Sequence, residues 1–468
     1  MQSDFLPLSS ATAPVAAPTI LLTATLRWPI AARLAMVFAA MGCRVDVVCP
    51  RQHPATRTRA IRHAYRYTVL RPLLSLQAAI EAAAPDFVIA CDDDAAIDLQ
   101  RLYARSVGAD LPARSLHGLI ARSLGSPDAC ALATARARLM TLAAEEGVRI
   151  PATAVVGGPG ELDTFLEQHK FPVVMKVDSS WGGQGVSIVE TREQARRAFD
   201  LLSSRPSMAG AMTRLLLDRD PSVLLSSLKK APRTVIVQEF IAGMPANRAV
   251  ACWQGQVLAG ISVEAIRTLH PTGPATVVQG IENAQMSEAV DRLVRRLGVS
   301  GLWGFDFVLQ ASTEAAYLVE ANPRATPVCH LPLGAGQGLA AALYTRLTGS
   351  APRTAPERLE RTTVVMFPGE WRRDPASPYL RSHYHDVPWD EPALVRDCID
   401  RPWSERGLIA RVWAQMRSKA SHHASPPRGF GRQARAAFLI DVIRRLQQQQ
   451  EAGTSSVRHR TDGAPPNR

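Results

Sequence analysis

The sequence predicts an α/β region followed by an α+β region and a basic C-terminal extension. Three observations carry this prediction. Near the N-terminus, apolar runs flank one helical pattern and a glycine, which is the order of a βαβ unit. From about residue 150 the pattern changes to short strands with glycine turns and intervening helices. After residue 350 the chain becomes rich in proline, arginine and tryptophan.

The composition is that of a folded protein with more than one domain. The chain has 468 residues, of which 46% are hydrophobic and 21% are charged, which is ordinary for globular proteins. At about 100–200 residues per domain, this length allows about two to four domains. Wholesale disorder, a collagen-like chain and a membrane bundle are therefore excluded as descriptions of the whole chain.

The positive charge is concentrated at the C-terminus. The formal net charge is +12, and residues 401–468 hold twelve arginines and one lysine against four acidic side chains. Three quarters of the surplus therefore lies in this segment, and the rest of the chain is close to neutral. Binding to nucleic acid is expected of this tail at most, and we expect no membrane partner.

The cysteines and the N-terminus indicate a cytoplasmic protein. The seven cysteines are an odd number, and no pair has CxxC spacing, so we expect reduced thiols rather than a disulfide framework. The first residues lack the cationic start and apolar run of a signal peptide. The apolar stretch 20–41 contains Arg27, Pro29 and Arg33, which argues against a membrane span.

The N-terminal part predicts a parallel sheet. Residues 1–18 are rich in Ser, Ala and Pro and are expected to be flexible. The pattern then reads strand, helix, glycine, strand and, further on, a third strand. The predicted strands are 19–25, 45–49 and 85–90, and the predicted helix is 31–41.

An acidic cluster follows the third predicted strand, where residues 91–94 read CDDD. In open parallel sheets, ligands bind beyond the carboxyl ends of the strands. Asp92, Asp93 and Asp94 are therefore placed to face a ligand. They are equally suited to cap the N-terminus of the following helix, so the sequence leaves both interpretations open.

The middle of the chain predicts a helix and then an α+β arrangement. A helical pattern over 129–146 ends at Gly147, and the last part of the chain carries one helical pattern at 435–450. Between them, short apolar runs alternate with amphipathic helices. The predicted strands are 154–156, 173–177, 186–189, 234–240 and 257–263, and the predicted helices are 192–202 and 287–297.

Residues 304–324, GFDFVLQASTEAAYLVEANPR, predict a hairpin with paired carboxylates. Centring the hairpin on Thr313 places Asp306 directly opposite Glu320. Like charges with Cβ atoms about 4.5–5.5 Å apart destabilise a bare hairpin, whereas a divalent cation between them would stabilise it. Magnesium prefers hard oxygen ligands, and Asp306, Glu320 and the Asn322 side-chain oxygen form such a set. The alternatives are a slipped register or a surface pair.

A glycine-rich turn follows a strand that carries a rare lysine. Lys176 is one of only five lysines, and it precedes a turn that contains Gly182, Gly183 and Gly185. Glycines let backbone N–H groups approach phosphate oxygens, although the GxxxxGK[ST] pattern of a P-loop is absent. An ammonium beside a phosphate explains the position of Lys176. The alternative is an ordinary turn.

These motifs together resemble the ATP-grasp superfamily. VVMK-x(5)-GGQG, VQEFIAG and GFDF-x(12)-EANPR occur in the order of that family. The resemblance covers about residues 129–349 and, more loosely, the N-terminal part, which is similar to the Rossmann-like pre-ATP-grasp domain. The EANPR segment especially resembles the biotin carboxylase and carbamoyl phosphate synthetase branch.

The resemblance implies a domain order. A pre-ATP-grasp domain would precede an ATP-grasp fold made of a lid and a C-terminal antiparallel-sheet subdomain. The expected boundaries are 1–18 for the flexible N-terminus, 19–128 for the pre-ATP-grasp domain, 129–350 for the ATP-grasp domain with its lid at about 150–235, 351–420 for a C-terminal extension, and 421–468 for a basic, partly disordered tail.

The resemblance also implies roles for single residues. Lys176 and Arg136 would contact the nucleotide phosphates, with Arg138 as the alternative to Arg136. Arg324 would stabilise the phosphorylated intermediate, and Lys176 would share in catalysis. Asp306, Glu320 and Asn322 would hold magnesium. The flap over the phosphates and the adenine hinge would supply the remaining nucleotide contacts: Trp181, Gly182, Gly183, Gln184 and Gly185 in the flap, and Glu239, Phe240 and Ile241 in the hinge.

Two positions depart from the pattern of many relatives. The ribose-binding acid seven residues after the hinge glutamate is Ala246 here, and Asn247 is its expected substitute. The arginine that ligases of the D-alanine type place two residues before the first metal carboxylate is Gly304 here. Arg324 would therefore carry that role.

The implied activity is ATP-dependent ligation by a protein that uses ATP with Mg²⁺ or Mn²⁺. A carboxylate would be phosphorylated to an acyl phosphate, and an amine or another nucleophile would displace the phosphate. The implied partners are small-molecule carboxylate and amine substrates, with a homodimer as the expected assembly. Two alternatives remain open: an enzyme of the carboxylase or carbamoyl-phosphate type that phosphorylates bicarbonate, and a nucleotide-binding scaffold without ligation.

Other polar residues give weaker signals. His383 and His385 form an HxH pattern without a third ligand in view, so a loop or strand face is favoured over a metal site. The superfamily places substrate contacts between the hinge and the metal hairpin. The candidates there are Glu264, Arg267, Thr276 and Gln279.

Overall fold

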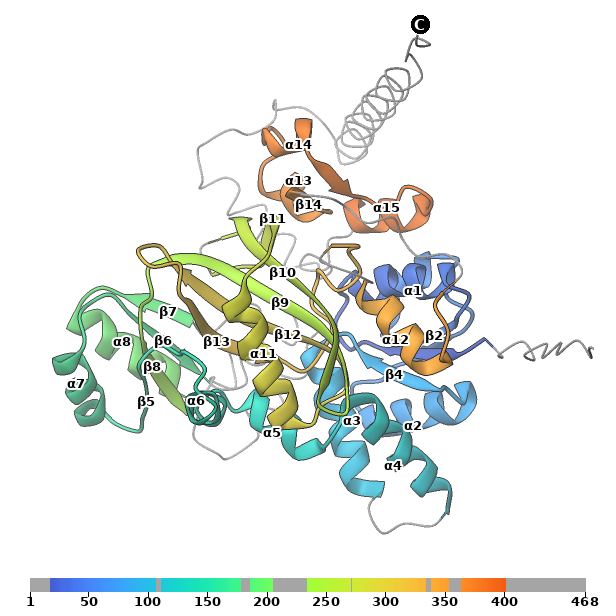
Figure 1. Ribbon diagram of the computed structural model, residues 1–468, viewed down its shortest axis with the longest axis horizontal. Helices are drawn as coiled ribbons and strands as arrows, with labels where there is room; N and C mark the ends of the chain where they lie inside the picture. Colours follow the sequence, from blue (N-terminus) through green and yellow to red (C-terminus); the bar gives the residue numbers. More distant parts are fainter. Residues whose placement is uncertain are drawn as a thin grey trace, which may run out of the picture.

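The computed structural model of the chain describes residues 17–106, 111–177, 186–204, 234–270, 272–333, 338–352 and 363–400 (Figure 1). The predicted flap residues, the tail helix at 435–450 and the basic tail lie outside these ranges. The described residues form three β-sheets, two of four strands and one of seven.

The first sheet is parallel, as its apolar runs predict. Its strands are β1 (Thr19–Thr23), β2 (Arg44–Cys49), β3 (Ala64–Arg66) and β4 (Phe87–Ala90), in the order β3-β2-β1-β4. The helices beside it are α1 (Ile30–Ala40), α2 (Pro72–Ala83) and α3 (Asp93–Ser106), and a 3₁₀ turn, η1 (Pro54–Arg57), lies between β2 and β3. All of β1 is buried, because helices cover both faces of such a sheet.

Three helices connect this sheet to the rest of the molecule: α4 (Leu111–Leu124), α5 (Pro127–Thr134) and α6 (Arg136–Glu145). The single helix predicted over 129–146 is therefore wrong. The helix is interrupted at Ala135, whose φ of −85° and ψ of 88° are not helical. Apolar spacing continues across this break, so periodicity alone does not reveal it. The break makes Arg136 the first residue of α6.

The second sheet is antiparallel, and its two faces differ. Its strands are β5 (Thr153–Val156), β6 (Val173–Val177), β7 (Val186–Val189) and β8 (Val235–Glu239), in the order β5-β8-β6-β7. Helices α7 (Pro159–Gln168) and α8 (Arg192–Ser203) cover one face, and the core there includes Val173, Met175 and Val177. Because side chains alternate along a strand, Lys176 belongs to the opposite face.

The third sheet is the largest and lies at the centre of the molecule (Figure 1). Its order is β13-β12-β9-β10-β11-β14-β15, and it is antiparallel except for the last pair. Helix α11 (Ala284–Leu297) packs on one face, and α12 (Leu339–Thr348) packs on the other face and contacts α1. Its first five strands in chain order are β9 (Gly243–Trp253), β10 (Gln256–Thr268), β11 (Ala275–Ile281), β12 (Gly301–Gln310) and β13 (Ala316–Asn322).

The C-terminal extension contributes the edge of this central sheet. It contains β14 (Thr363–Met366), α13 (Gly369–Arg373), α14 (Tyr379–Ser382), β15 (Tyr384–Asp386) and α15 (Pro392–Asp400). Glu391 accepts hydrogen bonds from the Thr58 hydroxyl and the Arg59 N–H, both at 3.1 Å. Asp386 pairs with Arg33 of α1. The extension thus links the central sheet to the N-terminal region.

All seven cysteines are free and buried, in keeping with the predicted absence of a disulfide framework. Within the described ranges, no helix combines the length and the apolar character that crossing a membrane would require.

Candidate active site

The predicted carboxylate pair is present on the hairpin of β12 and β13. Asp306 lies opposite Glu320, and Gly304 lies opposite Asn322. The predicted register is confirmed over these residues, and it shifts between Asp306 and Phe307. On the other side of β12, Asp306 lies opposite Asn247 of β9. Three strands therefore bring two carboxylates and two amides together.

Neighbouring side chains donate hydrogen bonds to the two carboxylates. Nη2 of Arg136 lies 2.8 Å from Oε1 of Glu320, and Nη1 of Arg136 donates to the Val177 carbonyl at 2.5 Å. Asp306 accepts from the side-chain N–H groups of Asn247 at 2.7 Å and Asn322 at 2.9 Å. Burial raises the pKa of Glu320, and the Arg136 charge opposes that rise. The structure thus places Arg136 and Asn247 directly at the carboxylate pair.

A divalent cation fits this set of donors. No group of three or more His, Cys, Asp or Glu side chains suited to a metal occurs among the described residues. A cation here would therefore rely on Asp306, Glu320 and the Asn322 oxygen, completed by ligands from outside the protein. Magnesium commonly uses one or two carboxylates together with substrate phosphates, which matches what these residues offer.

Lys176 approaches the carboxylate pair from the second sheet. Its residue is only 8% exposed, and burial lowers the pKa of its ammonium to about 8, although the Glu320 and Asp306 charges oppose the shift. Neither carboxylate forms a direct ion pair with Lys176 in the part of the chain that is described. A buried amine with a lowered pKa is poised to gain an anionic partner. Phosphate oxygens are such a partner.

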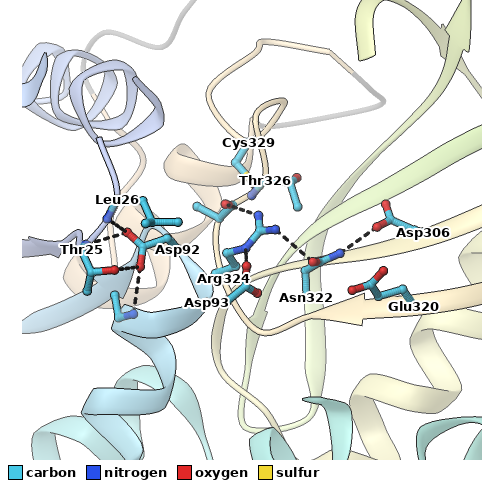
Figure 2. Close-up of polar contacts among 12 residues, drawn as sticks. Thr25, Leu26, Asp92, Asp93, Asp306, Glu320, Asn322, Arg324, Thr326 and Cys329 are labelled. Atoms are coloured by element: carbon cyan, nitrogen blue, oxygen red, sulfur yellow. Dashed lines mark hydrogen bonds and ion pairs between the residues drawn. The ribbon is translucent and has the colours of Figure 1, made fainter. Parts of the chain in front are cut away.

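Arg324 follows Asn322 by two residues and is also buried. Nε of Arg324 donates to Oδ2 of Asp93 at 2.8 Å, and Nη2 donates to Oδ1 of Asn322 at 3.0 Å (Figure 2). Nη1 contacts the Ala325 carbonyl at 3.3 Å, and the guanidinium carbon lies 5.0 Å from the centre of the Trp28 ring. Asn322 therefore stands between Arg324 and Asp306, with its amide oxygen toward the arginine and its N–H toward the carboxylate.

Within the acidic cluster, Asp92 fits the capping interpretation, and a contact of the cluster with a ligand stays a prediction. Asp92 accepts from the backbone N–H groups of Thr25, Leu26 and Ala95 at 2.7 to 3.0 Å, so it caps α3 and holds the loop after β1 (Figure 2). Burial raises the pKa of Asp92, although these hydrogen bonds oppose the rise. Asp93 instead faces Arg324. The sequence leaves open whether this cluster faces a ligand or caps a helix, and it does not predict the pairing of Asp93 with Arg324.

The predicted hinge joins the second and third sheets. Glu239 ends β8, and its backbone N–H donates to the Ala152 carbonyl at 2.9 Å. Phe240 and Ile241 follow before β9 begins at Gly243, and Ile241 is buried. The backbone N–H of Glu239 is thus used within the protein. Adenine recognition by this segment stays a prediction.

Gly304 and Thr326 explain one departure from the D-alanine-type pattern. A Cβ atom on Gly304 would lie 2.1 Å from Cγ2 of Thr326 and 3.4 Å from Nδ2 of Asn247. Thr326 also places its hydroxyl 3.4 Å from Oδ1 of Asn247. The space beside the carboxylates is therefore filled by Thr326, which the sequence did not single out. Trp28 was missed as well, because no local motif marks it.

The weaker candidates lie on other strands of the central sheet or in the extension. Thr276 donates to Glu370 at 2.6 Å, Gln279 accepts from Thr363 at 2.5 Å, and Arg267 lies over the Tyr379 ring. Glu264 pairs with Gln279 across β10 and β11. His385 packs edge-on against Trp371, and the His383 ring lies beside the Tyr379 ring.

Comparison with known proteins agrees with this architecture. Residues 142–328 match the family model of the ATP-grasp domain. The large chain of carbamoyl phosphate synthase from Kocuria rhizophila is 24% identical over 210 residues, which cover 43% of this chain. The match spans only 16% of the length of that relative.

Solved structures share the fold at low sequence identity. The biotin carboxylase of Campylobacter jejuni, in complex with β-γ-ATP, superposes with a TM-score of 0.53 at 14% identity and covers 74% of each chain. The biotin carboxylase domain of Hydrogenobacter thermophilus 2-oxoglutarate carboxylase, bound to MgADP, ADP and bicarbonate, gives 0.52 at 13% identity, covering 74% of this chain and 72% of that one.

A third solved structure with this fold is a synthetase. N5-carboxyaminoimidazole synthetase from Staphylococcus aureus, complexed with ADP, gives a TM-score of 0.51 at 13% identity, covering 74% of this chain and 80% of that one. The three sheets, the matched domain and these neighbours lead to one conclusion: residues 142–328 form an ATP-grasp domain, within a chain that shares the fold of these solved structures.

Proposed function

We propose that the chain is an ATP- and Mg²⁺-dependent ligase that phosphorylates a carboxylate substrate and transfers its acyl group to an amine or another nucleophile. The observation that carries this proposal is the meeting of Lys176 with Asp306 and Glu320. The lysine and the carboxylates come from different sheets. Burying an ammonium that has no direct ion pair is costly, and so is burying two adjacent carboxylates, unless an anion joins the first and a cation joins the second. A nucleotide phosphate chain with its metal supplies both.

Different residues would bind the phosphates, the metal and the adenine ring. Lys176 and Arg136 would neutralise phosphate oxygens, while Asp306, Glu320 and Asn322 would hold the cation. When bound, the metal would neutralise phosphate charge and act as a Lewis acid. The segment Glu239, Phe240 and Ile241 would bind the adenine ring. This assignment requires Arg136 to release Glu320 when the site fills. It also requires the cation to share the Asn322 oxygen, which has two lone pairs, with the Nη2 donor of Arg324.

The proposed chemistry proceeds in two balanced steps. A carboxylate oxygen attacks the γ-phosphorus, the bond to the β-phosphate oxygen breaks, and ADP leaves with that electron pair. The nucleophile then attacks the acyl carbon, loses a proton, and expels phosphate that retains the former carboxylate oxygen. Arg324 would stabilise the charge on the transferred phosphoryl group. The protein contributes mainly positioning, charge neutralisation and exclusion of water.

A second reaction of the same class has its own support. The relative aligned over 210 residues is a carbamoyl phosphate synthase, and one structural neighbour holds bicarbonate. The NPR triplet at 322–324 also resembles that branch. Bicarbonate in place of an organic acid would make carboxyphosphate through the same first step. Identifying the substrate therefore decides between a ligase for organic acids and a carboxylase-type or carbamoyl-phosphate-type enzyme.

An ADP-release assay tests the proposal. Purified protein with MgATP is assayed against a matrix of amino acids and small carboxylates, with bicarbonate as a separate arm. We expect release that depends on both magnesium and one acid, and its loss in the Asp306→Asn/Glu320→Gln variant. The matched control, Asp200→Asn/Glu288→Gln, removes two exposed carboxylates elsewhere and should behave like the parent.

Two results would contradict the proposal. Parent-like turnover by the Asp306→Asn/Glu320→Gln variant would refute the metal assignment. ATP binding without ADP release across the whole matrix would instead support a nucleotide-binding scaffold. Mn²⁺ is expected to replace Mg²⁺, because both accept oxygen ligands. A homodimer stays a prediction, and sedimentation of the purified chain tests it.

A further inference from the structure

Arg324 is held by two side chains that lie outside the matched ATP-grasp segment. Asp93 is the first residue of α3 and accepts the Nε–H of Arg324 at 2.8 Å. Trp28 lies in the loop after β1, with its ring 5.0 Å from the guanidinium carbon. These two side chains follow β4 and β1, which are neighbours in the parallel sheet. Ligands of such sheets gather at this edge.

Backbone contacts fix the geometry of this arrangement. The N–H of Ala325 donates to the carbonyl of Ala90 at 2.9 Å, which ties the residue after Arg324 to the end of β4. Asp92 joins the loop after β1 to the start of α3 through hydrogen bonds to Thr25 and Leu26. The elements that carry Asp93 and Trp28 are therefore held to each other and to the backbone beside Arg324. Figure 2 draws the contacts of Asp92 with Thr25 and Leu26.

The donors of Arg324 are only partly used. A guanidinium has five N–H groups, and the contacts of Arg324 use one on Nε, one on Nη1 and one on Nη2. Among the described residues, nothing else accepts a hydrogen bond from it. One N–H on each terminal nitrogen therefore remains, a pair that suits two oxygens of one anion. A residue only 8% exposed keeps such donors shielded from bulk water.

We propose that Asp93 and Trp28 are positioning residues for Arg324. The Asp93 carboxylate fixes the Nε edge, the Trp28 ring packs against the guanidinium, and the two remaining N–H groups are presented to the phosphoryl group in transfer. The inference rests on the proposed function. It makes the N-terminal parallel-sheet region part of the active site, and it assigns the acidic cluster a role beyond helix capping.

A double-mutant cycle tests the role of Asp93. ADP release is measured with MgATP and a fixed mixture of the twenty standard amino acids, acetate, succinate and bicarbonate. Asp93→Ala should lower the turnover number about tenfold or more while the KM for ATP stays within about twofold, because the lost contact acts on the transferred group. Asp93→Asn keeps an acceptor and should fall between parent and Asp93→Ala. In the Arg324→Lys background, Asp93→Ala should change turnover by less than about twofold.

The control variant is Asp98→Asn on the same helix. Asp98 is buried and accepts hydrogen bonds from the Tyr67 hydroxyl and from Arg101. Asp98→Asn therefore removes a buried carboxylate charge, as Asp93→Ala does, but it leaves the contacts of Arg324 intact. It should leave turnover at the parent value. Trp28→Phe should keep most of the activity and Trp28→Ala should not. An effect of Asp93→Ala that is additive with Arg324→Lys would overturn the inference, as would unchanged turnover.

Amide hydrogen exchange tests the positioning of Arg324 without any enzymatic activity, so it does not depend on the proposed function. In the unliganded full chain, Asp93→Ala should speed amide exchange in peptides from 320–333 about tenfold, while Asp98→Asn should not. If the parent releases no ADP with any mixture, the proposed function fails, and this exchange result alone decides whether Asp93 positions Arg324. Exchange equal to that of the parent would overturn the positioning role.

Discussion

Lys176 illustrates how one residue type becomes informative. In a chain with five lysines, a lysine in the middle of a strand and beside a glycine turn indicates a specific partner. The structure buries Lys176 near Glu320 and Asp306, and burial lowers the pKa of its ammonium to about 8. The scarcity of lysine and the spacing of Lys176 from the glycine turn predicted a phosphate contact for this residue. Its proximity to the carboxylates could not be predicted, because it depends on how two sheets meet.

Removal of Lys176 should weaken nucleotide binding. Lys176→Ala removes a charged donor, and hydrogen bonds to charged groups contribute about 1.5–3 kcal/mol, so the Kd for ATP should rise about tenfold to a hundredfold. Lys176→Arg keeps the charge and should lose less. Isothermal titration calorimetry measures both constants. An unchanged affinity in Lys176→Ala would rule out the phosphate role.

Nucleotide binding should also change the protonation of Lys176. With a pKa of about 8, lowered from 10.5 by burial, this amine is about half charged at pH 8 when the site is empty. Nearby phosphates raise the pKa of an amine, so ATP added without metal at pH 8 should bring an uptake of about half a proton. Calorimetry in buffers of different ionisation enthalpy measures this uptake. Lys176→Arg should abolish it, and an equal uptake in that variant would place the titrating group elsewhere.

At the scale of elements, the hairpin of β12 and β13 was predictable because register follows from alternation and turn position. Asp306 opposite Glu320 required only that rule. The interruption of the helix at Ala135 was not predictable, since Ala135 favours helix and the apolar spacing continues through it. Arg136, the first residue after the interruption, contacts Glu320 and Val177, which lie far away in the sequence and which no local pattern contains.

The packing of Gly304 against Thr326 gives a prediction for this hairpin. Gly304→Ala places a Cβ atom 2.1 Å from Cγ2 of Thr326, so we expect destabilisation by about 1–3 kcal/mol from overpacking. Thr326→Ser removes that methyl group while keeping the hydroxyl. The Gly304→Ala/Thr326→Ser variant should therefore recover most of the lost stability in chemical denaturation. If the second substitution adds to the loss, this contact is not the cause.

At the scale of the whole molecule, the C-terminal extension is an integral part of the fold. The sequence indicated only a segment rich in Pro, Arg and Trp after residue 350. The structure adds β14 and β15 to the central sheet and connects Asp386 to Arg33 of α1 and to His330, whose Nε2 lies 2.8 Å from the carboxylate. These partners are separated by more than fifty residues in sequence, so only the complete fold reveals the link.

Loss of the Asp386 charge should destabilise the protein. Asp386→Asn leaves Arg33 and His330 without their shared carboxylate, and breaking a buried pair costs about 3–5 kcal/mol. Burial opposes ionisation of Asp386, but Arg33 and His330 outweigh it and lower the pKa of this group. Its stabilisation is therefore fully present above the ordinary carboxyl pKa of about 3.9 and is lost as the pH falls through the lowered value.

Denaturation across pH measures this contribution. The difference in free energy of unfolding between parent and Asp386→Asn should be constant at neutral pH and shrink below about pH 4. Asp390→Asn alters an exposed carboxylate in the same extension and should change stability by less than about 0.5 kcal/mol. A difference that persists unchanged at low pH would show that the Asp386 charge is not the stabilising feature.

The central claim is that ATP activates a carboxylate through an acyl phosphate. Its most direct test follows ¹⁸O from a mixture of labelled carboxylic acids into the phosphate released from MgATP, in buffer freed of bicarbonate and analysed by mass spectrometry. The account predicts one ¹⁸O atom in each phosphate released, because the phosphate departs with a former carboxylate oxygen. Phosphate that carries no oxygen from the acids, and takes its label only from ¹⁸O-labelled water, would contradict it.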